Sequence, residues 1–151
     1  MQNTEFINEL DALLERYGTG LFTTLNHEGF PVTRWMTPFF LKGWKNSLFT
    51  VSAVPSAKVE QIEARGEVSF LFQPPSLEKI ITLTGLARVD HNYSLLAEAL
   101  ETMGGRLKTF WTVNNNPENL VVIETSLISG SIFYPFKSER CEVSFTGGGD
   151  E

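Results

Sequence analysis

The sequence has few of the residues that mark metal proteins, secreted proteins and membrane proteins. It contains one cysteine, Cys141, and two histidines among 151 residues. A single thiol excludes an internal disulfide framework and a cysteine-rich metal site, so we predict no metal centre and a reducing compartment. No apolar run is long enough to cross a bilayer, and the acidic N-terminal residues do not resemble a signal peptide. Both observations predict a cytoplasmic protein with no membrane association.

Basic residues are also scarce. The chain has 12 Lys and Arg against 18 Asp and Glu, which gives a formal net charge of -6. Such a balance disfavours a nucleic-acid partner, because the average field repels phosphate backbones. With 42% hydrophobic residues, the chain is long enough for one domain with a core and too short for two. We predict a single domain over residues 1–145 and a flexible, glycine-rich tail over 146–151.

Hydrophobic periodicity predicts a mainly β protein with peripheral helices. Apolar residues at helical spacing predict an N-terminal helix over about 4–17, a second helix that begins near 56–58 and a third that ends at Gly104. Gly85 is predicted to lie at a bulge or at a point of close backbone approach, and Cys141 to be a half-buried strand residue. Strands are predicted over 21–25, 31–37, 47–52, 67–73, 79–89, 120–125 and 130–134, the last with a possible continuation toward 145. Six or seven strands with short connections indicate a closed or split antiparallel barrel.

The segment from Arg34 to Lys58 contains a candidate phosphate site. Ser56 and Ala57 open a predicted helix that has Lys58 in its first turn, and a helix start offers unpaired N–H groups and the positive end of the dipole. Arg34, on a preceding strand, is a forked donor suited to a phosphate. The alternatives are that Arg34 pairs with a nearby surface Glu, that Ser56 is only an N-cap, and that Lys58 is simply solvated.

Several segments, in their order and spacing, carry a resemblance to a known family. They are 21–25 with Gly29 and Pro31, 34–36, 48–52, 56–59 and 68–72, with a weaker likeness through 84–89 and 120–133. Together they resemble the pyridoxamine 5'-phosphate oxidase-like, FMN-binding split-barrel superfamily, most of all its general stress protein 26 branch. The resemblance implies a homodimer with FMN in clefts at the subunit interface.

The resemblance also implies roles for individual residues. Arg34 and Lys58 would hold the FMN phosphate, together with Ser56 and the helix start at Ala57. The remaining implied contacts concern the flavin ring and the ribityl chain. Trp35 and Met36 would run beside the ring, Thr50, Val51 and Ser52 would face the ring edge and ribityl chain, Gln73 would reach the flavin from the neighbouring subunit, and Trp111 would cover a ring face.

The C-terminal region departs from the best-known enzyme of the superfamily. Pyridoxamine 5'-phosphate oxidases carry there a tryptophan followed by an arginine and a histidine that bind the substrate phosphate, and residues 133–141 contain no such set. We therefore predict an FMN-dependent oxidoreductase that acts on another small molecule with NADH or NADPH as a possible donor. No catalytic residue is assigned, and the role of 140–145 stays open. The alternatives are a non-catalytic flavin-binding stress protein, or a binder of a deazaflavin or of haem, the last disfavoured by the positions of His27 and His91.

Overall fold

The computed structural model describes residues 1–104 and 119–145. Trp111 and the predicted tail 146–151 lie outside the described residues. No helix within these two ranges is long and apolar enough to span a bilayer. The elements are α1 (Asn3–Tyr17), β1 (Gly20–Leu25), β2 (Pro31–Met36), β3 (Ser47–Ala53), α2 (Ala57–Ala64), β4 (Glu67–Phe72), β5 (Ile80–Asp90), α3 (Tyr93–Met103), β6 (Leu120–Tyr134) and β7 (Glu139–Ser144).

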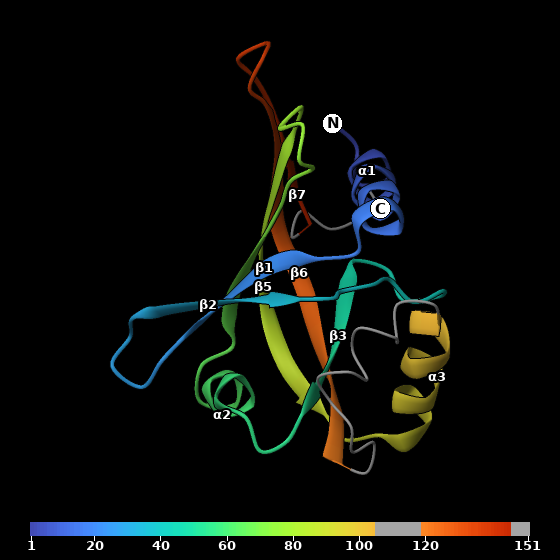
Figure 1. Cartoon of the computed structure of the whole chain (residues 1–151), viewed down its shortest axis with the longest axis vertical. Helices are drawn as coiled ribbons and strands as arrows, with labels where there is room; N and C mark the ends of the chain where they lie inside the picture. The colour runs from blue at the N-terminus through green and yellow to red at the C-terminus, as the bar shows by residue number, and fades with distance from the viewer. Residues whose placement is uncertain (105–118, 146–151) are drawn as a thin grey trace.

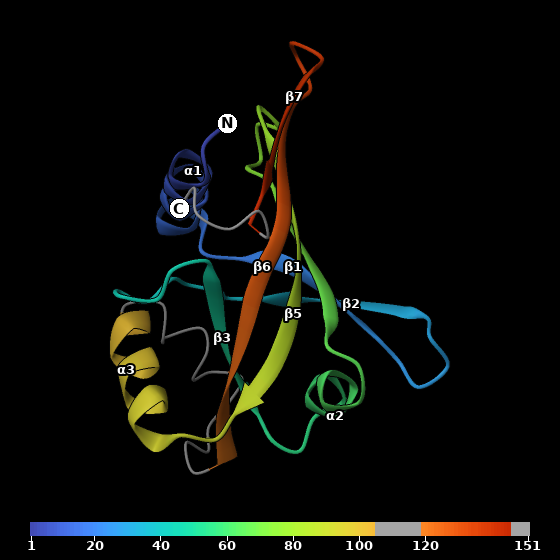
Figure 2. The ribbon, with the colours of Figure 1, turned by 180° about the vertical axis from the view of Figure 1, so that it is seen from behind.

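The strands form one seven-stranded antiparallel sheet in the order β2-β1-β4-β5-β6-β3, and β7 also pairs with β6. Strand β6 has three partners, because β5 lies along one of its edges while β3 and then β7 share the other. Figures 1 and 2 show β5 and β6 along the long axis, with the β1–β2 hairpin crossing them. The predicted fold class, mainly β with peripheral helices and six or seven antiparallel strands, is confirmed.

One expectation about the strands is wrong. Residues 120–125 and 130–134 belong to a single strand, β6, and do not form two. Thr84 pairs with Ser129 and Gly85 pairs with Leu127, so Ile128 is an extra residue that forms a bulge and lets the pairing continue. The bulge predicted at Gly85 is thus confirmed, and a Cβ there would lie only 2.6 Å from the Ser126 carbonyl oxygen.

The open question about residues 140–145 is also answered. Residues 139–144 form β7, which returns along β6 in an antiparallel hairpin. Cys141 lies in this strand and is half-buried, as predicted. Within the described chain, this segment is therefore part of the sheet.

Two apolar clusters lie on opposite faces of the sheet. The main cluster contains the inner face of α1 and the phenylalanines of β1 and β4, and the second lies between β3 and α3. Strand β3 serves both clusters by alternation, because Leu48 belongs to the main cluster while Phe49 and Val51 belong to the second. The ring of Phe6 occupies space that Gly130 leaves open, since a Cβ on Gly130 would lie 2.4 Å from Phe6 Cζ.

Helix α2 lies near the end of the molecule remote from α1, and α3 flanks β3 (Figures 1 and 2). Val59 and Ile62 bury one face of α2 in the main cluster, which fixes the short helix against β1 and β5. The start of α2 is thereby held at the end of β3. This is the arrangement on which the predicted phosphate site depends.

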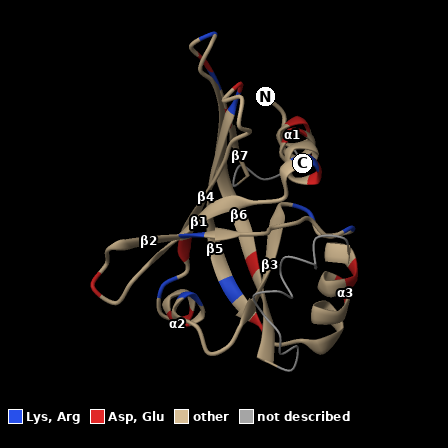
Figure 3. Ribbon diagram, in the orientation of Figure 1, with Lys and Arg blue, Asp and Glu red and all other residues tan. Residues whose placement is uncertain are grey.

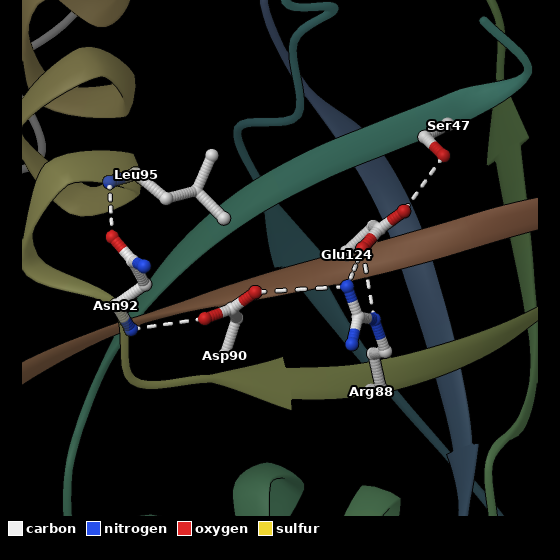
Figure 4. A network of polar contacts seen from close by, with 6 residues as sticks. All are labelled: Ser47, Arg88, Asp90, Asn92, Leu95 and Glu124. Atoms are coloured by element: carbon white, nitrogen blue, oxygen red, sulfur yellow. Dashed lines mark hydrogen bonds and ion pairs between the residues drawn. The ribbon is translucent and has the colours of Figure 1, made fainter. Parts of the chain in front are cut away.

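A polar network crosses the outer face of the sheet (Figure 4). Glu124 is 6% exposed, and its carboxylate accepts hydrogen bonds from Ser47 Oγ at 2.9 Å and from Arg88 Nε at 2.9 Å. Arg88 Nη2 also lies 2.7 Å from Glu124 Oε1 and 3.7 Å from Asp90 Oδ2. Asp90 accepts the Asn92 N–H, and Asn92 caps α3 by accepting the N–H of Leu95 at 3.0 Å. The network therefore joins β3, β5 and β6 to the start of α3.

We expect Arg88→Met to lower the free energy of unfolding by about 2 kcal/mol, because it leaves the buried Glu124 carboxylate without its cation. The double variant Arg88→Met/Glu124→Met should recover more than half of that loss, since no buried charge then remains. Urea denaturation measures both effects.

The matched control is Arg65→Met. Arg65 lies 3.6 Å from Glu67 with both side chains at least half exposed, so its loss should change the free energy of unfolding by less than about 0.5 kcal/mol. Equal losses in Arg88→Met and Arg65→Met would show that the network does not hold the sheet together.

Candidate phosphate-binding site

Helix α2 begins where the sequence predicted it. Ser56 is the N-cap residue, with extended backbone, and its Oγ accepts the N–H of Val59 at 3.4 Å. The Ser52 and Ser56 hydroxyl oxygens lie 3.4 Å apart, so the end of β3 and the start of the helix bring two hydroxyls together. The N-cap role is thus observed. Because the cap occupies the Val59 N–H, the N–H groups of Ala57 and Lys58 are those that the first turn would offer to an anion.

Arg34 turns toward α2 and contacts neutral acceptors. Its Nη1 donates to Thr24 Oγ1 at 2.7 Å and approaches the Phe22 carbonyl at 3.4 Å, while Nη2 donates to Gln61 Oε1 at 3.3 Å. The guanidinium also lies 5.9 Å from the centre of the Phe22 ring. No ion pair between Arg34 and a carboxylate occurs within residues 1–104 and 119–145, so the surface-pair alternative is not observed there.

Lys58 lies close enough to Arg34 for the two charges to repel. Burial lowers the pKa of Lys58, and the positive charge of Arg34 lowers it further. The pKa of Arg34 is itself lowered by burial. Figure 3 shows basic positions on both β2 and α2. Two partly desolvated cations beside a helix start form a place where an anion would relieve the repulsion and gain hydrogen bonds.

The predicted residues of β3 are all buried in the single chain. Thr50 is 1% exposed, and its Oγ1 has no hydrogen-bond partner within the described residues. Ser52 donates to the Ala53 carbonyl at 3.0 Å, and Val51 packs in the cluster under α3. Phe49 exchanges two backbone hydrogen bonds of 2.9 Å with Phe39 at the outer edge of β3. By strand alternation, the N–H and C=O groups of Val51 point to that same edge.

The other predicted residues lie apart from this group. Trp35 is 68% exposed and lies on the face of β2 opposite to Arg34, while Met36 lies on the Arg34 side, packed on the main cluster. Gln73 is exposed directly after β4, at the end of that strand remote from α2. The single chain thus brings together Arg34, Lys58 and the start of α2, and it does not bring Trp35 or Gln73 to them.

Thr24 and Gln61, two residues that contact Arg34, are not among the residues predicted from the sequence. Thr24 is fully buried on β1, two positions from Phe22, which pairs with Arg34 across the hairpin. Gln61 lies three positions after Lys58 on α2. A signal for Thr24 was present, because a polar residue occupies a position that the alternation of β1 assigns to the core.

Comparison with known proteins shows which solved structures have a similar fold. No protein-family model and no curated protein matches the sequence. A solved structure from Clostridium acetobutylicum, of a protein related to general stress protein 26 of B. subtilis, has a TM-score of 0.73 at 12% identity, covering 96% of this chain and 97% of that one. A pyridoxamine 5'-phosphate oxidase-related, FMN-binding protein from Nostoc punctiforme has a TM-score of 0.66 at 13% identity, covering 92% and 96%.

The chain has the pyridoxamine 5'-phosphate oxidase-like split-barrel fold. The resemblance predicted from segments 21–25, 34–36, 48–52, 56–59 and 68–72 is therefore confirmed at the level of the fold. A haem-binding protein from Mycobacterium smegmatis shares this split barrel, with a TM-score of 0.67 at 15% identity over 89% of this chain and 56% of that one. Split barrels thus occur in proteins named for different cofactors.

The lowered pKa of Lys58 predicts a specific pH dependence of stability. Between its folded-state pKa and its ordinary value of 10.5, the unfolded chain binds more protons than the folded chain, so stability rises with pH across that window. The penalty for burying the ammonium is present below the folded-state pKa and disappears as the pH rises toward 10.5.

We therefore expect wild type to gain stability relative to Lys58→Met as the pH rises from neutral to about 10.5, measured as the difference between their free energies of unfolding. Urea titrations at several pH values measure it, with Lys42→Met as an exposed-lysine control. A difference that stays constant with pH would show that Lys58 is not desolvated.

Proposed function

We propose that this chain binds FMN and acts as an FMN-dependent oxidoreductase on a small molecule. The observation that carries the proposal is the pair of half-buried cations, Arg34 and Lys58, which have no carboxylate ion pair within the described residues and lie beside the start of α2. A phosphomonoester is a dianion and suits two cations and a helix start together. The Nostoc punctiforme structure, of an FMN-binding protein with the same fold, supports this choice of anion.

The chain's own residues fit the proposed cofactor from its phosphate toward its ring. Arg34, Lys58, the Ser56 hydroxyl and the N–H groups at Ala57 would hold the phosphate. The outer edge of β3 at Val51 presents backbone donor and acceptor groups of the kind that a flavin pyrimidine edge needs. The unpartnered Thr50 hydroxyl is a further polar group in the same strand. Bound FMN would supply hydride chemistry, which requires the protein mainly to bind and orient the ring.

The proposal includes a homodimer with FMN at the subunit interface. Trp35 is largely exposed on an edge strand, and Gln73 is exposed at the far end of β4, so neither completes the site within one chain. In the proposed dimer, Gln73 of one subunit would approach the flavin held by the other. NADH or NADPH is the proposed electron donor.

A second candidate is a flavin-binding stress protein without turnover. The contacts of Arg34 are a hydroxyl, an amide and a carbonyl, none of which transfers a proton near neutral pH. The structural similarity to a protein related to general stress protein 26 is compatible with this role. Reduction by a nicotinamide separates the two candidates.

We expect purified protein mixed with FMN to retain the absorption bands of oxidised flavin after the excess is removed, and to bleach with NADH or NADPH. Arg34→Ala and Lys58→Ala should each weaken FMN binding by about tenfold or more, because each removes a charge-assisted hydrogen bond to the phosphate. The control Arg65→Ala, on the exposed end of α2, should bind FMN as wild type does.

The outcomes separate the candidates. Retained flavin without bleaching favours the non-catalytic flavin protein, and a Soret band after incubation with haem favours the haem alternative. Unchanged FMN affinity in both alanine variants would remove Arg34 and Lys58 from the site.

The proposed dimer has its own measurement. Sedimentation equilibrium should give twice the mass of the 16.9 kDa chain, and Trp35→Glu should shift the protein toward monomer because it places a charge in the proposed interface. A monomeric wild type would contradict the placement of FMN between subunits.

A further inference from the structure

We infer that Thr24 and Gln61 are positioning residues that hold the Arg34 guanidinium ready for the cofactor phosphate; the inference rests on the proposed function. The three residues come from three elements, β1, α2 and β2. Neither Thr24 nor Gln61 needs to touch the cofactor in this role. Both act through the orientation that they give to Arg34.

The contacts form a closed triangle of hydrogen bonds. The Thr24 hydroxyl accepts from Arg34 Nη1 at 2.7 Å and donates to Gln61 Oε1 at 2.5 Å. Gln61 Oε1 also accepts from Arg34 Nη2 at 3.3 Å. The single hydroxyl proton of Thr24 is thus directed at Gln61. The lone pairs of the Thr24 oxygen stay available to accept from Arg34. Within the described residues, Arg34 Nε makes no hydrogen bond, so a donor remains for a further acceptor.

The acceptors around Arg34 orient the guanidinium without neutralising it. Arg88 provides the contrast inside the same protein, because Glu124 and Asp90 hold it and raise its pKa. Arg34 has instead a threonine hydroxyl, a glutamine amide and a carbonyl, and burial lowers its pKa. A cation fixed by neutral groups keeps its full charge for an incoming anion.

Gln61 also couples Arg34 to the other phosphate-binding groups. It lies three positions after Lys58, on a neighbouring part of the α2 surface, and α2 carries Ser56 at its N-cap. The hydrogen bond from Arg34 to Gln61 therefore ties the edge strand β2 to the helix that presents Lys58. Ordering a long arginine side chain before binding removes that entropy cost from the binding step.

The experiment compares the affinities for FMN and for riboflavin, which lacks the phosphate, in Gln61→Leu, Thr24→Val and Thr24→Ser. We expect Gln61→Leu and Thr24→Val to weaken FMN binding about five- to twentyfold while riboflavin binding stays within about twofold. Thr24→Ser keeps the hydroxyl and should bind FMN with the affinity of wild type. Equal losses for both flavins, or no loss for FMN, would overturn the inference, because a merely structural role does not distinguish the two ligands.

A double-mutant cycle tests whether Gln61 acts through Arg34. In the Arg34→Met background, Gln61→Leu should cause no further loss of FMN affinity, because the group that it positions is gone. The same five- to twentyfold loss in that background would overturn the inference. Thermal unfolding of each variant without flavin identifies any variant that fails to fold.

A failure of the proposed function can be told apart from a failure of this inference. A wild type that binds neither flavin contradicts that proposal, and the Arg34 Nη–H signals in ¹⁵N NMR of the flavin-free protein then decide this inference, because Nη1 and Nη2 are the groups that Thr24 and Gln61 hold. A slowly exchanging signal in wild type and Thr24→Ser that is lost in Gln61→Leu and Thr24→Val supports the positioning role. The same signal in all four proteins would overturn it.

Discussion

The pairing of β6 with three other strands is the constraint on which the rest of the structure depends. Strand β5 follows β6 along its length, β3 pairs with its first half, and β7 pairs with its second half. The bulge at Ile128 separates these halves and keeps both in register. Because α1 docks through Phe6 on Gly130 and α3 packs on Val122, β6 also places two of the helices. The position of β3, and with it the start of α2, follows from this strand.

Arg88 and Arg34 are held by opposite kinds of contact. On the outer face, the charge of Arg88 is matched by the buried Glu124 and by Asp90, which suits a group that joins strands. Arg34 has neutral acceptors and a second cation, Lys58, as a neighbour. Such an arrangement is unfavourable in the empty protein and becomes favourable when an anion is present. This difference supports the proposal that Arg34 is a binding group, whereas Arg88 joins strands.

The single chain assembles the phosphate end of the proposed site and leaves its ring end open. Strand β3 presents an outer edge beside Val51, while Trp35 and Gln73 are exposed on other parts of the surface. A site divided in this way is what the proposed dimer would complete. The neutral contacts of Arg34 suit binding and orientation, which is the role that a flavin leaves to its protein.

Local patterns in the sequence determined the element types and the start of α2 at Ser56. These features follow from periodicity, capping and turn chemistry, which act over a few residues. The family resemblance and the phosphate-binding chemistry of the two side chains, and not local pattern, grouped Arg34 with Lys58. The sequence predicted two strands, 120–125 and 130–134, where the structure has one, because the bulge at Ile128 that joins them depends on the pairing of β6 with Gly85. Only the tertiary structure decided that β6 is continuous, that Thr24 and Gln61 hold Arg34, and that Trp35 faces away from it. Those outcomes depend on contacts between segments far apart in the chain, about which the spacing of residues along one strand or helix carries no information.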